Sequence, residues 1–92
     1  ENFILWSIAK DQPSFSVCIP HDGNEACVGN GVMISFTAVS KEIVDEMHKV
    51  ALENGGIDEG APGERMPGYY MAYFRDLDGN KFAAFHATGE AA

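Results

Sequence analysis

Residues 69–85 read YYMAYFRDLDGNKFAAF, and they carry the strongest structural signal in the chain. Two runs rich in aromatic residues, 69–75 and 81–85, flank a polar segment that contains Asp78 and Gly79. Glycine adopts a positive φ without steric cost, and Asp-Gly between two apolar runs is a strong signal for a tight turn. The stretch therefore predicts a β-hairpin.

Successive side chains of a strand point to opposite faces, so the sequence of this hairpin also predicts what each face carries. One face holds Tyr70, Ala72, Phe74, Phe82 and Ala84. The other face holds Tyr69, Met71, Tyr73, Arg75, Lys81, Ala83 and Phe85. Neither face is wholly polar, which indicates that both are covered. We expect a helix on one face and a cleft lined by the other; a sheet packed on both faces without a ligand is the alternative.

A second hairpin is predicted at the N-terminus. Residues 3–8 (FILWSI) and residues 14–19 (SFSVCI) have the composition and alternation of strands. Residues 11–13 (DQP) supply the turn between them, since proline fixes its own φ. Residues 20–31 are rich in turn-forming residues and predict a linker.

The middle of the chain predicts a strand and then a helix. Residues 32–37 (VMISFT) alternate as a strand does, with an apolar face and a mixed face. Ser40 is expected to cap the helix, and Val39 and Val44 have the spacing of a hydrophobic staple. The helix carries one apolar stripe at helical spacing, formed by Ile43, Val44, Met47, Val50 and Ala51.

Glycines and prolines dominate the segment after this helix. Residues 54–56 (NGG) are expected to stop the helix, because glycine accepts the left-handed conformation just past its end. Residues 57–67 hold two glycines and two prolines, which predicts a long loop or a loop that contains a weak edge strand.

Composition restricts the class of protein. The chain has 92 residues, enough for one domain, and a net charge of −8 from 14 acidic and 6 basic side chains. Nucleic acids and anionic membranes need a basic surface, so neither is an expected partner. No apolar run approaches the roughly 20 residues of a membrane span. We expect a cytoplasmic protein in which Cys18 and Cys27 are reduced thiols, and a processed or truncated chain because residue 1 is Glu.

The order from residue 32 onward is strand, helix, loop or weak strand, strand, strand. Its most distinctive segments are GNGVMISF at 29–36, VDEMHKVAL at 44–52, GG at 55–56, GAPG at 60–63, PGYY at 67–70 and DLDGNK at 76–81. Together these resemble the vicinal oxygen chelate superfamily, which includes glyoxalases, bleomycin resistance proteins and extradiol dioxygenases.

The resemblance implies an α+β fold made of one domain, residues 1–92. Residues 30–88 would form a complete βαβββ module of glyoxalase/bleomycin-resistance type. Residues 1–20 would be the final hairpin of a first module whose opening strand and helix are absent. A sheet left with unpaired edges invites association, so the resemblance also implies a homodimer.

Enzymes of the superfamily bind a divalent cation through His or Glu side chains. The resemblance places two of these positions at Met33 and Ala83, where a thioether is a poor ligand and a methyl group is none. We therefore expect no metal site and no cofactor. His21 lies in a turn, His48 is expected to be partly buried or at the surface, and His86 is expected to follow the last strand in an exposed position.

Without a metal, the face of the sheet away from the helix is still expected to line a cleft for a small-molecule ligand. Its expected residues are Met33, Ser35, Tyr69, Met71, Tyr73, Ala83 and Phe85, with Arg75 as a charged anchor or as a partner of Asp76 or Asp78. The leading hypothesis is metal-independent binding of a small, partly aromatic or apolar ligand. A divalent-metal-dependent lyase or dioxygenase and a non-catalytic assembly fragment are the alternatives, and whether the chain is an enzyme stays open.

Overall fold

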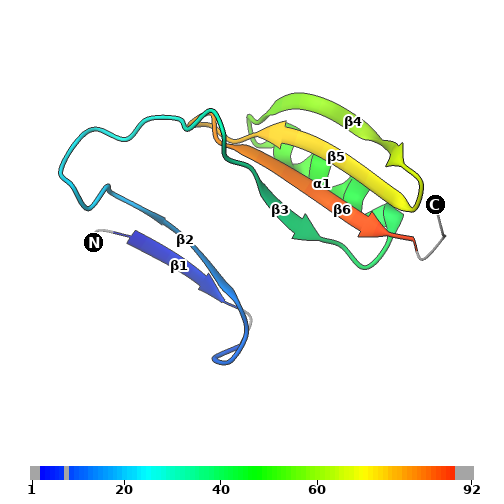
Figure 1. Cartoon of the computed structure of the whole chain (residues 1–92), viewed down its shortest axis with the longest axis horizontal. Helices are drawn as coiled ribbons and strands as arrows, with labels where there is room; N and C mark the ends of the chain where they lie inside the picture. Colours follow the sequence, from blue (N-terminus) through cyan, green and yellow to red (C-terminus); the bar gives the residue numbers. More distant parts are fainter. Residues whose placement is uncertain (1–2, 8, 89–92) are drawn as a thin grey trace.

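The computed structural model describes residues 3–7 and 9–88, which form two β-sheets and one helix (Figure 1). The elements in chain order are β1 (Phe3–Ser7), β2 (Ser14–Cys18), β3 (Ile34–Thr37), α1 (Lys41–Glu53), β4 (Ile57–Met66), β5 (Tyr69–Arg75) and β6 (Lys81–Ala87). This confirms the predicted α+β class, with a βαβββ module after an N-terminal hairpin. Among the described residues, no helix is long and apolar enough to span a bilayer.

The module contains a four-stranded sheet in the order β3-β6-β5-β4. β3 pairs with β6 in parallel, whereas β5 pairs with β6 and with β4 in antiparallel fashion. α1 contacts β4, β5 and β6 and lies behind the sheet in Figure 1. One face of the sheet is therefore covered by the helix.

Both ends of α1 follow from local sequence. The Ser40 hydroxyl accepts a hydrogen bond from the Ile43 N–H at 3.2 Å, which confirms the predicted N-cap. At the other end Gly55 has a φ of 96°. The N–H groups of Gly55 and Gly56 donate to the carbonyls of Leu52 and Ala51, at 3.1 and 2.8 Å, in the pattern of a Schellman motif.

The predicted hydrophobic staple at the start of α1 is wrong. Val39 is 86% exposed, whereas Val44 is completely buried. The backbone at Ala38 is tied to the end of β6, since its N–H donates to the Phe85 carbonyl at 2.7 Å. The chain thus enters the helix along the sheet, and the Val39 side chain points to solvent.

The apolar stripe of α1 is also rotated from its predicted position. Ile43 and Val50 are 41% and 42% exposed, so the buried line runs through Val44 and His48. The core between helix and sheet consists of Ala38, Val44, Ala72 and Ala84, with Met47 and Tyr70 packed against it. Ala72 lies opposite Ala84 in the β5–β6 pair, and these two methyl groups let the helix approach closely.

The β5–β6 turn has the predicted chemistry. The Asp76 carboxylate accepts hydrogen bonds from the N–H groups of Asp78 and Asn80, at 3.0 and 2.8 Å. Gly79 has a φ of 90°, where a residue with a Cβ would be strained. The hairpin is confirmed, although β6 extends two residues beyond the predicted strand.

β4 corrects the expected loop at 57–67. It is a ten-residue strand at the edge of the sheet, longer than the weak edge strand given as the alternative. Its pairing with β5 shifts register between Asp58 and Gly60, between Gly60 and Gly63, and between Glu64 and Met66. Pro62 lies within the central shift of register, so its missing N–H interrupts no regular hydrogen bond between the strands.

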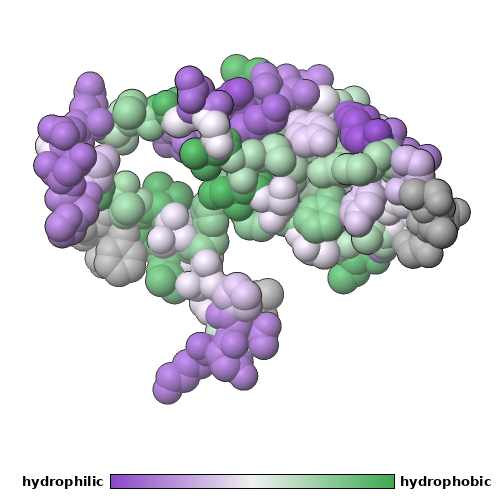
Figure 2. Space-filling model, viewed as in Figure 1, coloured by the Kyte–Doolittle hydropathy of each residue, from purple (hydrophilic) through white to green (hydrophobic). Residues whose placement is uncertain are grey.

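The N-terminal hairpin forms the separate two-stranded sheet, with β1 and β2 antiparallel as predicted. It meets the module through Phe15, whose ring lies edge-on to Phe36 and Phe82 with centroids 5.6 and 6.0 Å apart. Figure 2 shows apolar side chains in green along this hairpin and a polar tip. β3 starts at Ile34, two residues later than predicted.

Candidate functional site

The register of β5 and β6 sorts their side chains onto two faces. The helix face comprises Tyr70, Ala72, Phe74, Phe82, Ala84 and His86, and it includes two residues of the core beneath α1. The open face comprises Tyr69, Met71, Tyr73, Arg75, Lys81, Ala83 and Phe85. Ser35 lies beside Ala83 in the β3–β6 pair and joins the open face. Seven of the eight predicted ligand-binding residues thus share one face, and Met33 precedes β3 beside it.

The centre of the open face is packed and its margin is exposed. Ala83 is completely buried and Met71 is 9% exposed. Tyr73 and Phe85 are half-buried, and the Tyr73 hydroxyl donates to the Met71 sulfur at 3.5 Å. Figure 2 views the sheet from the side opposite α1, and apolar and polar side chains intermingle there. This surface can therefore offer ring faces and polar groups together.

Two basic side chains lie against the Tyr73 ring. The Lys81 ammonium is 5.4 Å from the ring centroid, and the Arg65 guanidinium carbon is 5.5 Å from it. Such cation–π contacts hold a charge beside an aromatic ring without a carboxylate. Sequence reasoning placed Lys81 on the correct face without giving it a role. It missed Arg65, because that residue belongs to the segment expected to be a loop.

Glycines in β4 make room for Arg65. A Cβ atom on Gly63 would lie 2.9 Å from the Arg65 Nη1, closer than packed atoms allow. A Cβ atom on Gly60 would lie 2.9 Å from the Tyr73 ring. The guanidinium also donates to the Ala61 carbonyl. The absence of side chains at these two positions of β4 therefore leaves room for this positive charge beside the Tyr73 ring.

Arg75 differs from the other two basic groups because it has a carboxylate partner. Its Nε lies 3.3 Å from the Glu59 Oε1, and its Nη1 donates to the Gly79 carbonyl at 2.7 Å. The predicted alternative of pairing with Asp76 or Asp78 is wrong, since the carboxylate comes from β4. Arg75 thus clamps the β5–β6 turn to the edge strand.

The histidines lie apart from the open face. His48 on α1 is 7% exposed, and its Nε2 lies 2.9 Å from the Asp58 Oδ1 on β4. Hydrogen bonds from His48 and from the Gly60 N–H hold the pKa of Asp58 below its usual range. From the sequence His48 is expected to be partly buried or at the surface, and it is instead buried, because it reaches from α1 to the edge strand. This contact joins the helix to the edge strand.

His86 corrects an expectation. It lies within β6 instead of after it, is half-buried, and its Nδ1 lies 3.0 Å from the Ala38 carbonyl, to which it can donate. His21 is exposed in its turn. His86 and His48 each have a structural partner on the helix side of the sheet.

The residues present do not fit a metal centre of the superfamily type. Ala83 offers a buried methyl group, and Met33 offers a thioether. Within residues 3–7 and 9–88, no three His, Cys, Asp or Glu side chains gather where they could hold a metal ion.

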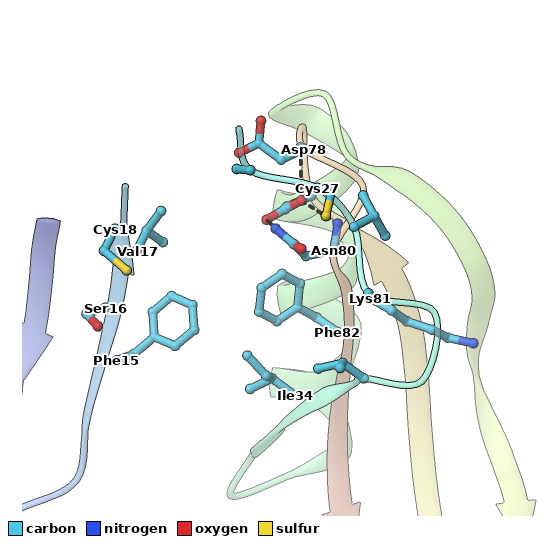
Figure 3. Close-up of a pocket in the computed structure, with 15 residues that line it drawn as sticks. Phe15, Ser16, Val17, Cys18, Cys27, Ile34, Asp78, Asn80, Lys81 and Phe82 are labelled. Atoms are coloured by element: carbon cyan, nitrogen blue, oxygen red, sulfur yellow. Dashed lines mark hydrogen bonds between the residues drawn. The ribbon is translucent and has the colours of Figure 1, made fainter. Parts of the chain in front are cut away.

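A cavity of about 450 Å³ lies elsewhere, between β2, the linker and the β5–β6 turn (Figure 3). Phe15 and Phe82 point toward one another across it, and Cys18 and Cys27 flank it as free thiols. None of the eight predicted ligand-binding residues lines this cavity. Sequence reasoning missed it because the path of a linker leaves no periodic signal.

Several solved structures are similar to this chain. A glyoxalase/bleomycin resistance protein from Albidiferax ferrireducens T118 is 36% identical, with a TM-score of 0.83 over 94% of this chain and 69% of that one. A hypothetical protein from S. aureus is 36% identical, with a TM-score of 0.58 over 63% of this chain and 44% of that one.

A glyoxalase/bleomycin resistance protein/dioxygenase family enzyme from Burkholderia phytofirmans PsJN shares the fold. It is 24% identical, with a TM-score of 0.60 over 72% of this chain and 50% of that one. No protein-family model and no curated protein matches the chain.

Proposed function

The chain belongs to the glyoxalase/bleomycin resistance protein family, within the vicinal oxygen chelate superfamily, and we propose that it binds a small, partly aromatic or apolar molecule on the open face without a metal ion. The observation that carries the proposal is the composition of that face. Tyr69, Tyr73 and Phe85 present partly exposed rings around Met71, on the side of the sheet away from α1. Rings and thioethers give a large, adaptable apolar contact.

The absence of a metal from the proposal rests on side-chain chemistry. Met33 and Ala83 occupy the two positions where the superfamily resemblance places ligands, and neither suits a hard divalent cation. Elemental analysis of protein dialysed without chelator tests this point. Near-unit Zn²⁺, Mn²⁺, Ni²⁺ or Fe²⁺ would instead support the metal-dependent lyase or dioxygenase.

We further propose that a second copy of the chain faces the open face in a homodimer. β3 and β4 are the edges of the four-stranded sheet, and unpaired edges favour association. A twofold arrangement would enclose the ligand between equivalent surfaces. Light scattering behind size exclusion should give twice the mass of a single chain. A folded species at the single-chain mass at every concentration tested would reject the dimer.

The binding proposal is tested by NMR with isotope-labelled protein and a set of small aromatic compounds. Binding compounds should shift the signals of Tyr69, Met71, Tyr73 and Phe85. Tyr73→Ala should weaken their binding, because it removes the central ring of the face. Trp6→Leu is the matched control, since it removes an exposed ring from the N-terminal hairpin.

Two results would count against the proposal. Shifts confined to Cys18, Cys27 and their neighbours would move the ligand to the cavity beside β2. Equal affinity in the wild type and in a folded Tyr73→Ala variant would show that the open face does not hold the compound.

A further inference from the structure

We propose that the open face selects small organic anions, in which a carboxylate is attached to a planar apolar group. Arg65 and Lys81 receive the negative charge beside Tyr73. This inference deepens the proposed function and rests on it, and it names the class of ligand.

The first argument is the distribution of positive charge. The chain has 6 basic side chains against 14 acidic ones. Arg65, Arg75 and Lys81, half of the basic total, lie on the three adjacent strands β4, β5 and β6. Both Arg65 and Lys81 approach the same Tyr73 ring. Positive charge in an acidic chain is thus concentrated where the aromatic rings are.

The second argument is that two of these charges have no ion-pair partner among the described residues. The ion pairs among the described residues are His48 with Asp58 and Arg75 with Glu59. Glu59 is engaged by Arg75, and neither Arg65 nor Lys81 forms an ion pair with a described carboxylate. With carboxylates more than twice as numerous as basic groups, such pairs would form readily on a randomly arranged surface. A ligand carboxylate would supply the missing partner.

The third argument is geometric. One direction of the Arg65 guanidinium is used by the Ala61 carbonyl, which leaves further N–H groups of its planar fork for a carboxylate. Although Lys81 borders the cavity beside β2, its ammonium end points away from that cavity in Figure 3. Its charge is therefore available to a ligand on the open face. The Tyr73 ring between the two groups offers a surface on which a planar group can stack.

The test uses benzoate as the probe and benzamide as its neutral counterpart of similar shape. Titrations followed by NMR or calorimetry should show tighter binding of benzoate. Arg65→Gln and Lys81→Gln should each weaken benzoate binding about tenfold, as expected for the loss of a charge-assisted hydrogen bond, and should leave benzamide unchanged. Lys49→Gln is the matched control, because it removes the same charge from the exposed surface of α1.

Gly63→Ala provides a test of position that keeps every charge. Its Cβ atom would displace the Arg65 guanidinium and touches no other side chain as closely. Benzoate binding should weaken toward that of Arg65→Gln while benzamide binding stays the same. A merely structural effect on the sheet would weaken both probes alike.

Several results would overturn the inference. It would be rejected by equal affinities for benzoate and benzamide or by no binding of benzoate. It would also be rejected if Lys49→Gln lost as much benzoate affinity as Arg65→Gln and Lys81→Gln do. One combination of results separates this inference from the proposed function: Tyr73→Ala weakens the binding of benzamide, while Arg65→Gln and Lys81→Gln bind benzoate as tightly as the wild type does. The proposed binding face then stands, and only its selectivity for anions fails.

Discussion

The helix face and the open face are built from the same two strands, yet they differ in the size of the side chains at their centres. On the helix face Ala72 and Ala84 lie opposite each other, and the helix fills the space above them. On the open face the neighbouring positions carry Met71, Tyr73 and Phe85. Small residues thus mark the centre of the helix face, where α1 packs and which aromatic residues flank, whereas large side chains on the open face surround Ala83. The size of alternate side chains is as informative as their polarity.

The largest expected effect comes from making the helix face resemble the open face. Ala72→Leu should lower the free energy of unfolding by about 2–3 kcal/mol, because α1 leaves no room for a larger side chain. Urea unfolding measures the change. Ala87→Leu, at an exposed position of β6, should stay within about 0.5 kcal/mol of the wild type. Equal costs at both positions would remove the basis of the comparison.

The reverse change on the open face should cost less stability. Tyr73→Ala should lower the free energy of unfolding by about 1–2 kcal/mol, less than the 3–5 kcal/mol typical of a fully buried aromatic residue, since Tyr73 is half-buried. Thermal and urea unfolding give the value. A loss of about 3–5 kcal/mol in the free energy of unfolding would identify Tyr73 as a core residue and weaken its assignment to a ligand site.

The smallest effect concerns the link between α1 and β4. The hydrogen bond from His48 holds the pKa of Asp58 below its ordinary value, so the ionised carboxylate is favoured in the folded state. This contribution is present above the unfolded pKa and is lost as the pH falls through the lower folded pKa. Unfolding measured across this acidic range should be less pH-dependent in Asp58→Asn than in the wild type. Asp11→Asn, in the exposed N-terminal turn, should retain the wild-type slope.

The predictable parts of the fold are those specified by neighbouring residues. Ser40, Gly55 and Gly79 each act within a few positions, and their cap, stop and turn are present. The staple at Val39 failed because the backbone there follows β6, a strand that lies far along the chain. Local chemistry could not reveal that constraint.

The candidate site likewise has a part that the sequence predicts and a part that it does not. Alternation along β5 and β6 placed Tyr73 and Phe85 on one face, because a strand's period of two is exact. Arg65 could not be placed, since the shifts of register in β4 break that period between Asp58 and Met66. The partner of Arg75 also depended on this irregular strand.

The parallel pairing of β3 with β6 has a consequence for how the chain folds. β3 is the first strand of its sheet to be synthesised, and the strand that completes it is the last described element of the chain. The β5–β6 hairpin needs only a five-residue closure, whereas the β3–β6 contact must close a loop of more than forty residues. During synthesis β3 and its apolar neighbours wait without a partner until β6 leaves the ribosome. Folding of this module is therefore expected to be set by the arrival of its final strand.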